Sequence, residues 1–156
     1  MPTDTLNTLL EQAEAERNQV LAAYTHTRAR ADAAREQALQ LEAYRADYRH
    51  RWSLRLAQGV GLDIVRCYQG FADRLEVAIA QQAHAVTLAQ AALVRAGDVL
   101  SAHELRVASV RKLIERRSAA ERQLRERIEQ KADDEQATRI ALSRDVHGLR
   151  NTGVPL

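Results

Sequence analysis

The residues that could do chemistry in this chain are scattered rather than grouped. The chain has five histidines, His26, His50, His84, His103 and His147. None of them lies three or four residues from another, which is the spacing that places two metal ligands on one helix face. The carboxylates occupy ordinary solvated helix positions. These residue types therefore predict no metal site, no cofactor and no catalytic centre.

Two further features with chemical potential have simpler interpretations. Cys67 is the only cysteine, so the chain has no internal disulfide, and it has no CxxC partner. We expect it to be a half-buried structural thiol. Gly59 and Gly61 lack the rest of any phosphate-binding motif, so they indicate a turn. The sequence therefore predicts a protein that is not an enzyme.

The elements that carry these residues are two long helices. Proline occurs only at Pro2 and Pro155, and the one obvious interruption between them is the segment 58–61. Helix-forming Ala, Leu, Glu, Arg and Gln dominate on both sides of it. We expect one helix at about 4–57, a turn at 58–62 and a second helix at about 63–145. The predicted fold is all-α, a long two-helix antiparallel coiled coil.

A heptad seam supports this fold on both helices. Positions seven apart on the second helix are Ala72, Ile79, Val86, Leu93, Leu100, Val107, Ile114, Glu121 and Ile128. Their companion positions are Leu75, Gln82, Ala89, Ala96, His103, Val110, Arg117 and Leu124. The first helix has a seam at Leu6, Leu10, Ala13, Val20, Tyr24, Thr27, Ala31, Ala34, Ala38, Leu41, Tyr48 and Trp52, which Arg17 and Arg45 interrupt. A repeat sustained over so many heptads is typical of a coiled coil.

The second helix is predicted to be longer than its partner. Folded back on it, the first helix covers only about 63–118, and residues of about 119–147 extend beyond the partner's N-terminus. Residues 1–147 would form a single coiled-coil domain, and residues 148–156 a flexible tail. Gly97 lies inside the second helix, where a kink near 97–101 and a continuous helix are both open, and we favour the continuous helix.

Composition limits the possible partners. Basic residues number 23 and acidic residues 21, so the net charge is only +2 although the pI is about 9.0. Charges of both signs are interleaved almost everywhere, whereas nucleic-acid binders show a one-signed stripe. We see no signal segment and no run approaching about 18 consecutive apolar residues, so we expect a cytosolic protein.

Aromatic residues are scarce but gather near the turn. Tyr44, Tyr48 and Trp52 precede it, and Tyr68 and Phe71 follow it. An antiparallel hairpin that turns at about 60 brings these two groups to the same level. Some of them must pack in the seam. Their number exceeds what a two-stranded seam hides, so we expect part of the cluster to be an exposed partner-binding patch.

Three segments resemble motifs of one family. Residues 40–48, QLEAYRADY, resemble the L-x-x-Y-R-x-x-Y segment of the FliJ flagellar export stalk family. Residues 68–79, YQGFADRLEVAI, resemble its Y-Q-x-F-x-x-R-L-x-x-A-I segment. Residues 111–117, RKLIERR, resemble its K-x-x-E-R-R element. The resemblance covers about 5–135.

The resemblance implies a non-enzymatic, cytoplasmic component of the flagellar type III export apparatus, peripheral to the inner membrane. The implied fold is similar to the stalk of the rotary ATP synthase γ subunit. The implied partners are the hexameric export ATPase FliI, the export gate protein FlhA and export chaperones, with no nucleic acid and no direct membrane insertion.

The family's binding surfaces can be carried over by residue. The implied gate-binding face is Gln37, Leu41, Tyr44, Tyr48, Phe71, Leu75, Ala78 and Gln82. Gln82 departs from the histidine expected at that position of the family. The implied ATPase-ring surface is Lys112, Arg116, Arg117, Arg122, Arg125 and Arg127.

Two alternatives remain at this point. One is a stalk protein of a virulence-type III secretion system, which belongs to the same functional class. The other is a basic coiled coil that binds nucleic acid or acts as a scaffold, based on the pI and the arginine-rich stretch 111–127.

Overall fold

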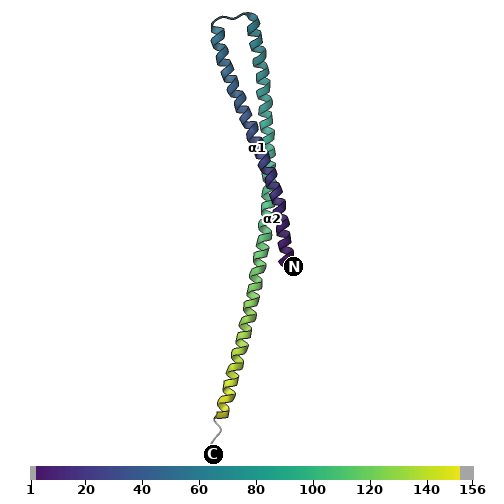
Figure 1. The fold of residues 1–156 in the computed structure, drawn as a ribbon, viewed down its shortest axis with the longest axis vertical. Coiled ribbons are helices and arrows are strands. Elements are labelled where there is room, and N and C mark those ends of the chain that lie inside the picture. Colours follow the sequence, from purple (N-terminus) through teal and green to yellow (C-terminus); the bar gives the residue numbers. More distant parts are fainter. Residues whose placement is uncertain (1–2, 152–156) are drawn as a thin grey trace, which may run out of the picture. The chain divides into compact units, whose positions relative to one another are not determined.

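Two helices make up the part of the chain that the structure, a computed structural model, describes, which is residues 3–151. Helix α1 spans Thr3–Ala57 and helix α2 spans Leu62–Asn151. The described residues contain no strand. The two helices pack against each other on either side of one turn (Figure 1). The predicted all-α helical hairpin is therefore confirmed.

The turn owes its shape to Gly59. Its φ is +84°, a left-handed conformation that glycine adopts without steric cost and that commonly ends helices. The amide of Gly59 donates to the carbonyl of Leu56, and the amide of Gln58 donates to that of Arg55. On the other side, the amides of Ile64 and Val65 donate to the carbonyl of Gly61. These four hydrogen bonds satisfy part of the backbone groups that helix ends expose.

Helix α2 continues further than the sequence suggested. It is uninterrupted through Gly97, as predicted, and a Cβ there would meet only the Tyr24 ring at 3.6 Å. Its end at Asn151 lies beyond the predicted end near 145, so residues 148–151, expected in a flexible tail, are helical. The rest of that tail, 152–156, lies outside the described residues.

The chain divides into two compact units. One comprises Leu10–Val107, and the other combines the N-terminal residues up to Leu9 with those from Ala108 onward. Each is described separately below, and we call them the hairpin unit and the terminal unit. The single domain that we expect over 1–147 stays a prediction.

The core of the hairpin unit is the predicted seam. Every seam residue predicted in this unit is buried or half-buried. The most completely covered are Ala13, Ala31, Leu75 and Val107. Two of these four are alanines, which bury little area but let the helix axes approach closely. The core is therefore a thin, continuous seam.

The terminal unit is covered over only part of its length. Leu6 is buried, and Val110, Ile114 and Arg117 are half-buried. From Ser118 to Asn151 every residue is exposed, including Leu124 and Ile128, which the heptad pattern had assigned to the seam. The heptad columns thus continue past Arg117 without forming a seam, as expected for the stretch of about 119–147 that the first helix was predicted not to cover.

One stretch of helix α2 meets the length and hydropathy criteria for a membrane span. Helix α2 contains an 18-residue window with a mean hydropathy of 1.3, which makes it long and apolar enough by length and composition to cross a membrane. Residues 77–94 carry no charged side chain. One such helix is weak evidence for a membrane span, since soluble proteins also contain helices that meet the same criteria.

Candidate functional site

The aromatic cluster is centred on Tyr48. The centroid of its ring lies 4.7 Å from that of Phe71 and 5.4 Å from that of Tyr68. On its own helix it lies 6.2 Å from Tyr44 and 6.1 Å from Trp52. Tilted and offset rings at such separations are mutually attractive beyond the area that they bury. The cluster therefore joins α1 and α2 next to the turn, at the place that the sequence predicted.

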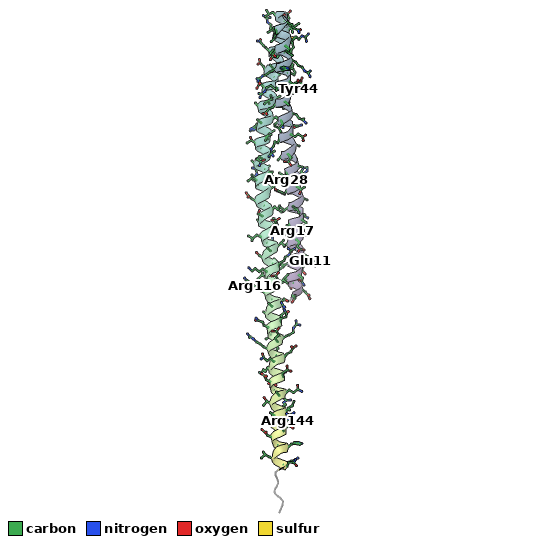
Figure 2. All side chains as sticks on the ribbon, turned by 90° about the vertical axis from the view of Figure 1, so that its left-hand side faces the viewer. Glu11, Arg17, Arg28, Tyr44, Arg116 and Arg144 are labelled. Carbon is green, nitrogen blue, oxygen red and sulfur yellow. The ribbon has the colours of Figure 1, made fainter. Side chains whose placement is uncertain are left out.

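Tyr44 differs from the other members of the cluster. Its side chain is 50% exposed, whereas Tyr48, Trp52, Tyr68 and Phe71 are half-buried. The Tyr44 ring still contacts the edge of Phe71, with centroids 6.3 Å apart. Figure 2 labels Tyr44 on α1 near the turn. Tyr44 is therefore the ring that the cluster presents most fully to a partner.

The residues implied as the gate-binding face gather around one side of this cluster. Gln37 and Tyr44 are exposed, and Leu75 is buried at 7% exposure. The remaining five, Leu41, Tyr48, Phe71, Ala78 and Gln82, are half-buried. Two of the eight thus face solvent directly, and Leu75 supports the others from the core. Their role in binding a gate stays a prediction.

A cavity of about 420 Å³ lies within this face. It is lined by Gln37, Gln40, Leu41, Tyr44 and Gln82. The Gln82 amide donates to the Ala34 carbonyl at 2.9 Å and lies 3.4 Å from Oε1 of Gln37. A polar side chain in the seam is therefore satisfied across the two helices. Gln40 was missed by the sequence reasoning, although it lies three and four residues from Gln37 and Tyr44.

A second cavity, of about 230 Å³, adjoins the aromatic cluster. Tyr44, Tyr48, Arg51, Trp52 and Arg55 line it. The Arg55 guanidinium lies 5.5 Å from the centre of the Trp52 ring, within the range of a cation–π contact. Arg51 pairs with Asp47 at 3.0 Å. Arginine and aromatic side chains are the types most enriched at binding hot spots, so this end of the hairpin unit is well suited to a protein partner.

The arginines in the seam have different surroundings. Arg45, which interrupts the first-helix seam, donates to both carboxylate oxygens of Glu76 at 3.0 and 3.1 Å. Arg49 donates to the same carboxylate at 3.0 Å. Arg17 instead donates to its neighbour Asn18.

The buried Nδ1 of His103, at a seam position, has no hydrogen-bond partner in the described chain.

The six basic residues implied as the ATPase-ring surface all belong to the terminal unit. Arg117 is half-buried and lies 4.0 Å from Glu121, and the other five, Lys112, Arg116, Arg122, Arg125 and Arg127, are exposed. Lys112 and Arg116 line a cavity of about 290 Å³, and Figure 2 shows the Arg116 side chain extending from α2. The surface that they form stays a predicted binding site.

Apolar side chains accompany these arginines. Leu113 lines the same cavity as Arg116, and Leu124 and Ile128 are each 60% exposed. Glu121, Glu126 and Glu129 are interleaved with the basic residues. Nucleic-acid binders show basic residues clustered on one face or along a helix. The interleaved glutamates argue against a nucleic-acid interface on this stretch.

The residues first considered for chemistry remain separate in the structure. Cys67 is exposed, so the expectation of a half-buried thiol is wrong; it lies outside the seam, one residue before Tyr68. No group of three potential metal ligands occurs in the described range 3–151.

Comparison with known proteins assigns the chain to a family. No curated protein and no solved structure matches it. A family model described as the flagellar FliJ protein matches residues 3–145, nearly the whole of the 156-residue chain. The order of the three motifs, the helical hairpin and this match agree, and the chain belongs to the FliJ family of flagellar export proteins.

Proposed function

We propose that this protein is a non-enzymatic stalk that links the export ATPase ring to the membrane export gate. The observation that carries the proposal is the distribution of its two candidate surfaces. The aromatic face belongs to the hairpin unit and the basic stretch to the terminal unit, and helix α2 contributes to both without interruption. One helix that contributes residues to both surfaces supports a coupling role, because the two partners would then bind the same continuous element.

In this proposal the two surfaces have different partners. The face around Tyr44 binds the gate protein FlhA, with Tyr44 and Gln37 making direct contact. The stretch from Lys112 to Arg127 binds the ATPase FliI. The protein acts in the cytoplasm at the inner-membrane export apparatus and also binds export chaperones. The match to a flagellar family model supports this system over the virulence-type alternative.

The test separates the two surfaces. Tyr44→Ala combined with Phe71→Ala should weaken capture of the gate protein's cytoplasmic domain and leave capture of the ATPase unchanged. Arg122→Glu combined with Arg125→Glu should have the reverse effect. Circular dichroism confirms that helicity is retained, and ATP hydrolysis is measured with and without each variant.

Arg144→Glu is the matched control for the basic stretch, because Arg144 is exposed in the same unit but lies outside it (Figure 2). It should leave both interactions intact. Loss of ATPase binding with Arg144→Glu as large as with Arg122→Glu and Arg125→Glu would show that net charge, not this surface, governs binding. Unchanged gate binding in the Tyr44 and Phe71 variant would refute the aromatic face.

A further inference from the structure

The hairpin unit has two edges, which are formed by the side chains that flank the seam. One edge is closed by contacts between the helices. Arg49 and Arg45 pair with Glu76, and Arg35 donates to Oε1 of Gln90 at 3.0 Å. Because flanking positions recur every seven residues, Arg28, Arg35 and Arg49 lie on this same edge. We call it the paired edge.

The other edge is open. A cavity of about 340 Å³ lies along it, lined by Thr27, Arg30, Ala85, Leu88, Ala89 and Ala92. Arg30, Gln37 and Tyr44 are spaced by seven on α1, so this cavity and the one beside Gln37 lie on the same edge. On α2 the facing positions are Ala78, Ala85 and Ala92, which are too short to reach across to α1. We call this the open edge.

The charge on the open edge is of one sign. Between the Glu16–Arg106 pair and the Asp47–Arg51 pair, the positions that flank this side of the seam contain no carboxylate on either helix. Arg30 lines the cavity, and Arg95 lies seven residues from Leu88 on α2. Both are exposed, and neither makes an ion pair with any of the described residues. In a chain whose charges nearly balance, this edge has two unpaired cations beside an uncharged floor.

The residues of α2 that form the floor of this cavity, Ala85, Leu88, Ala89 and Ala92, are apolar, and all but Leu88 have short side chains. Leu88 is 57% exposed, although the seam residues next to it are covered. The alanines on either side of Leu88 have short side chains, which allow another helix to approach α2 closely. Residues 77–94 also contain no charged side chain that would have to be desolvated. A third helix could therefore bury its apolar face here without burying an unpaired charge.

We propose that the part of the open edge around Leu88 is a docking groove for an acidic amphipathic helix of a partner protein. The apolar side chains of that helix pack over Ala85, Leu88 and Ala92, and its carboxylates pair with Arg30 and Arg95. The proposal goes beyond the stalk role, because these five residues belong to neither the gate-binding face nor the ATPase-ring surface. Arg30, which lines the cavity, and Arg95, seven residues from Leu88 on α2, fit a helix with flanking carboxylates. A nucleic acid would need a longer row of cations.

The test uses two synthetic peptides and the full-length protein. Both peptides are helical, with leucine at the seam positions. One has glutamate at the flanking positions and the other has lysine there. The acidic peptide should bind roughly tenfold or more tightly than the basic peptide in fluorescence polarisation, because opposite charges at an interface favour the correct partner. The preference should shrink as the salt concentration rises.

Three variants locate the site. Arg30→Glu combined with Arg95→Glu should reverse the preference, so that the basic peptide binds more tightly. Ala85→Trp fills the groove without changing charge and should weaken binding of the acidic peptide. Arg28→Glu is the matched control, because Arg28 is an exposed arginine on the paired edge. It should leave the preference for the acidic peptide unchanged.

Several results would overturn the proposal. These are equal binding of the two peptides to the unmodified protein, a loss with Arg28→Glu equal to that with the Arg30 and Arg95 double variant, and an Ala85→Trp variant that binds normally. A single-stranded RNA oligomer that binds at Arg30 and Arg95 while the acidic peptide does not would also overturn it. Gate and ATPase capture should be unchanged in these variants, so failure of the groove and failure of the stalk role can be told apart.

Discussion

Helix α2 contains two regions that share a heptad pattern but have opposite surroundings. From Ala72 to Arg117 its heptad positions are buried or half-buried, whereas from Ser118 to Asn151 every residue is exposed. Leu75 is 7% exposed in the first region, and Leu124 is 60% exposed in the second, although both occupy the same heptad column. The difference shows that an apolar residue at a heptad position is not buried by the pattern alone. It becomes part of a seam only where a facing helix packs against it.

The two regions must therefore be stabilised differently. In the covered region, tertiary packing against α1 adds to helix propensity. In the exposed region, the helix depends on its own backbone hydrogen bonds and its good helix formers. Long isolated helices are only marginally stable in water, so the exposed apolar residues Leu124 and Ile128 are available to a partner that would stabilise them.

The largest contrast is expected for truncation of equivalent leucines. Leu75→Ala should lower the free energy of unfolding by about 2–5 kcal/mol, because it leaves a cavity in the seam. Leu124→Ala should change it by no more than about 0.5 kcal/mol, because its side chain is already in water. Urea unfolding followed by circular dichroism measures both. A Leu124→Ala loss as large as that of Leu75→Ala would mean that the second region is covered in solution.

A smaller contrast is expected when alanines are enlarged. Ala31 is 2% exposed, so Ala31→Leu should push the helices apart and destabilise the protein by about 1–3 kcal/mol. Ala119→Leu is the control, because Ala119 is exposed and because alanine and leucine are both good helix formers. It should leave the unfolding midpoint nearly unchanged. An Ala31→Leu variant as stable as the unmodified protein would contradict the close approach of the two helices.

The smallest contrast concerns ion pairs. Glu76→Gln removes the partner of both Arg45 and Arg49, but the carboxylate is partly exposed, so the loss should be about 1 kcal/mol or less. Glu121→Gln removes a pair within one helix turn and should cost less than about 0.5 kcal/mol. Repeating the unfolding at high salt should shrink both effects, since salt screens exposed charges. A salt-independent loss for Glu76→Gln would show that packing, not charge, accounts for it.

Much of the fold was predictable because its signals are local. The absence of internal proline, the glycines near 60 and the heptad columns indicated two helices and their seam. The burial of each predicted seam residue in the hairpin unit agrees. The errors have local causes as well. Residues 148–151 contain a glycine and follow a weakened seam, yet they continue the helix. Cys67 was expected to be half-buried, yet it is exposed.

The candidate sites were predictable in part. The spacing of Tyr44, Tyr48 and Phe71 across the turn predicted their contact, because register follows from where an antiparallel hairpin turns. The open edge was missed. Assigning the positions that flank the seam, and counting carboxylates on each side, would have shown that one edge lacks them. Whether Arg30 and Arg95 are unpaired depends on which side chains reach from one helix to the other. Heptad periodicity alone does not predict those contacts.

The sequence by itself determined the two helices, the position of the turn and the residues available for a seam, because helix periodicity and glycine conformation act over a few neighbouring residues. Only the tertiary structure decided which of those residues are covered. It exposed Tyr44 while half-burying Tyr48, covered Leu75 but not Leu124, and closed one edge of the hairpin unit while leaving the other open. The physical reason is that a side chain is buried or paired only when another helix lies against it. The residues on that other helix are far away in the sequence.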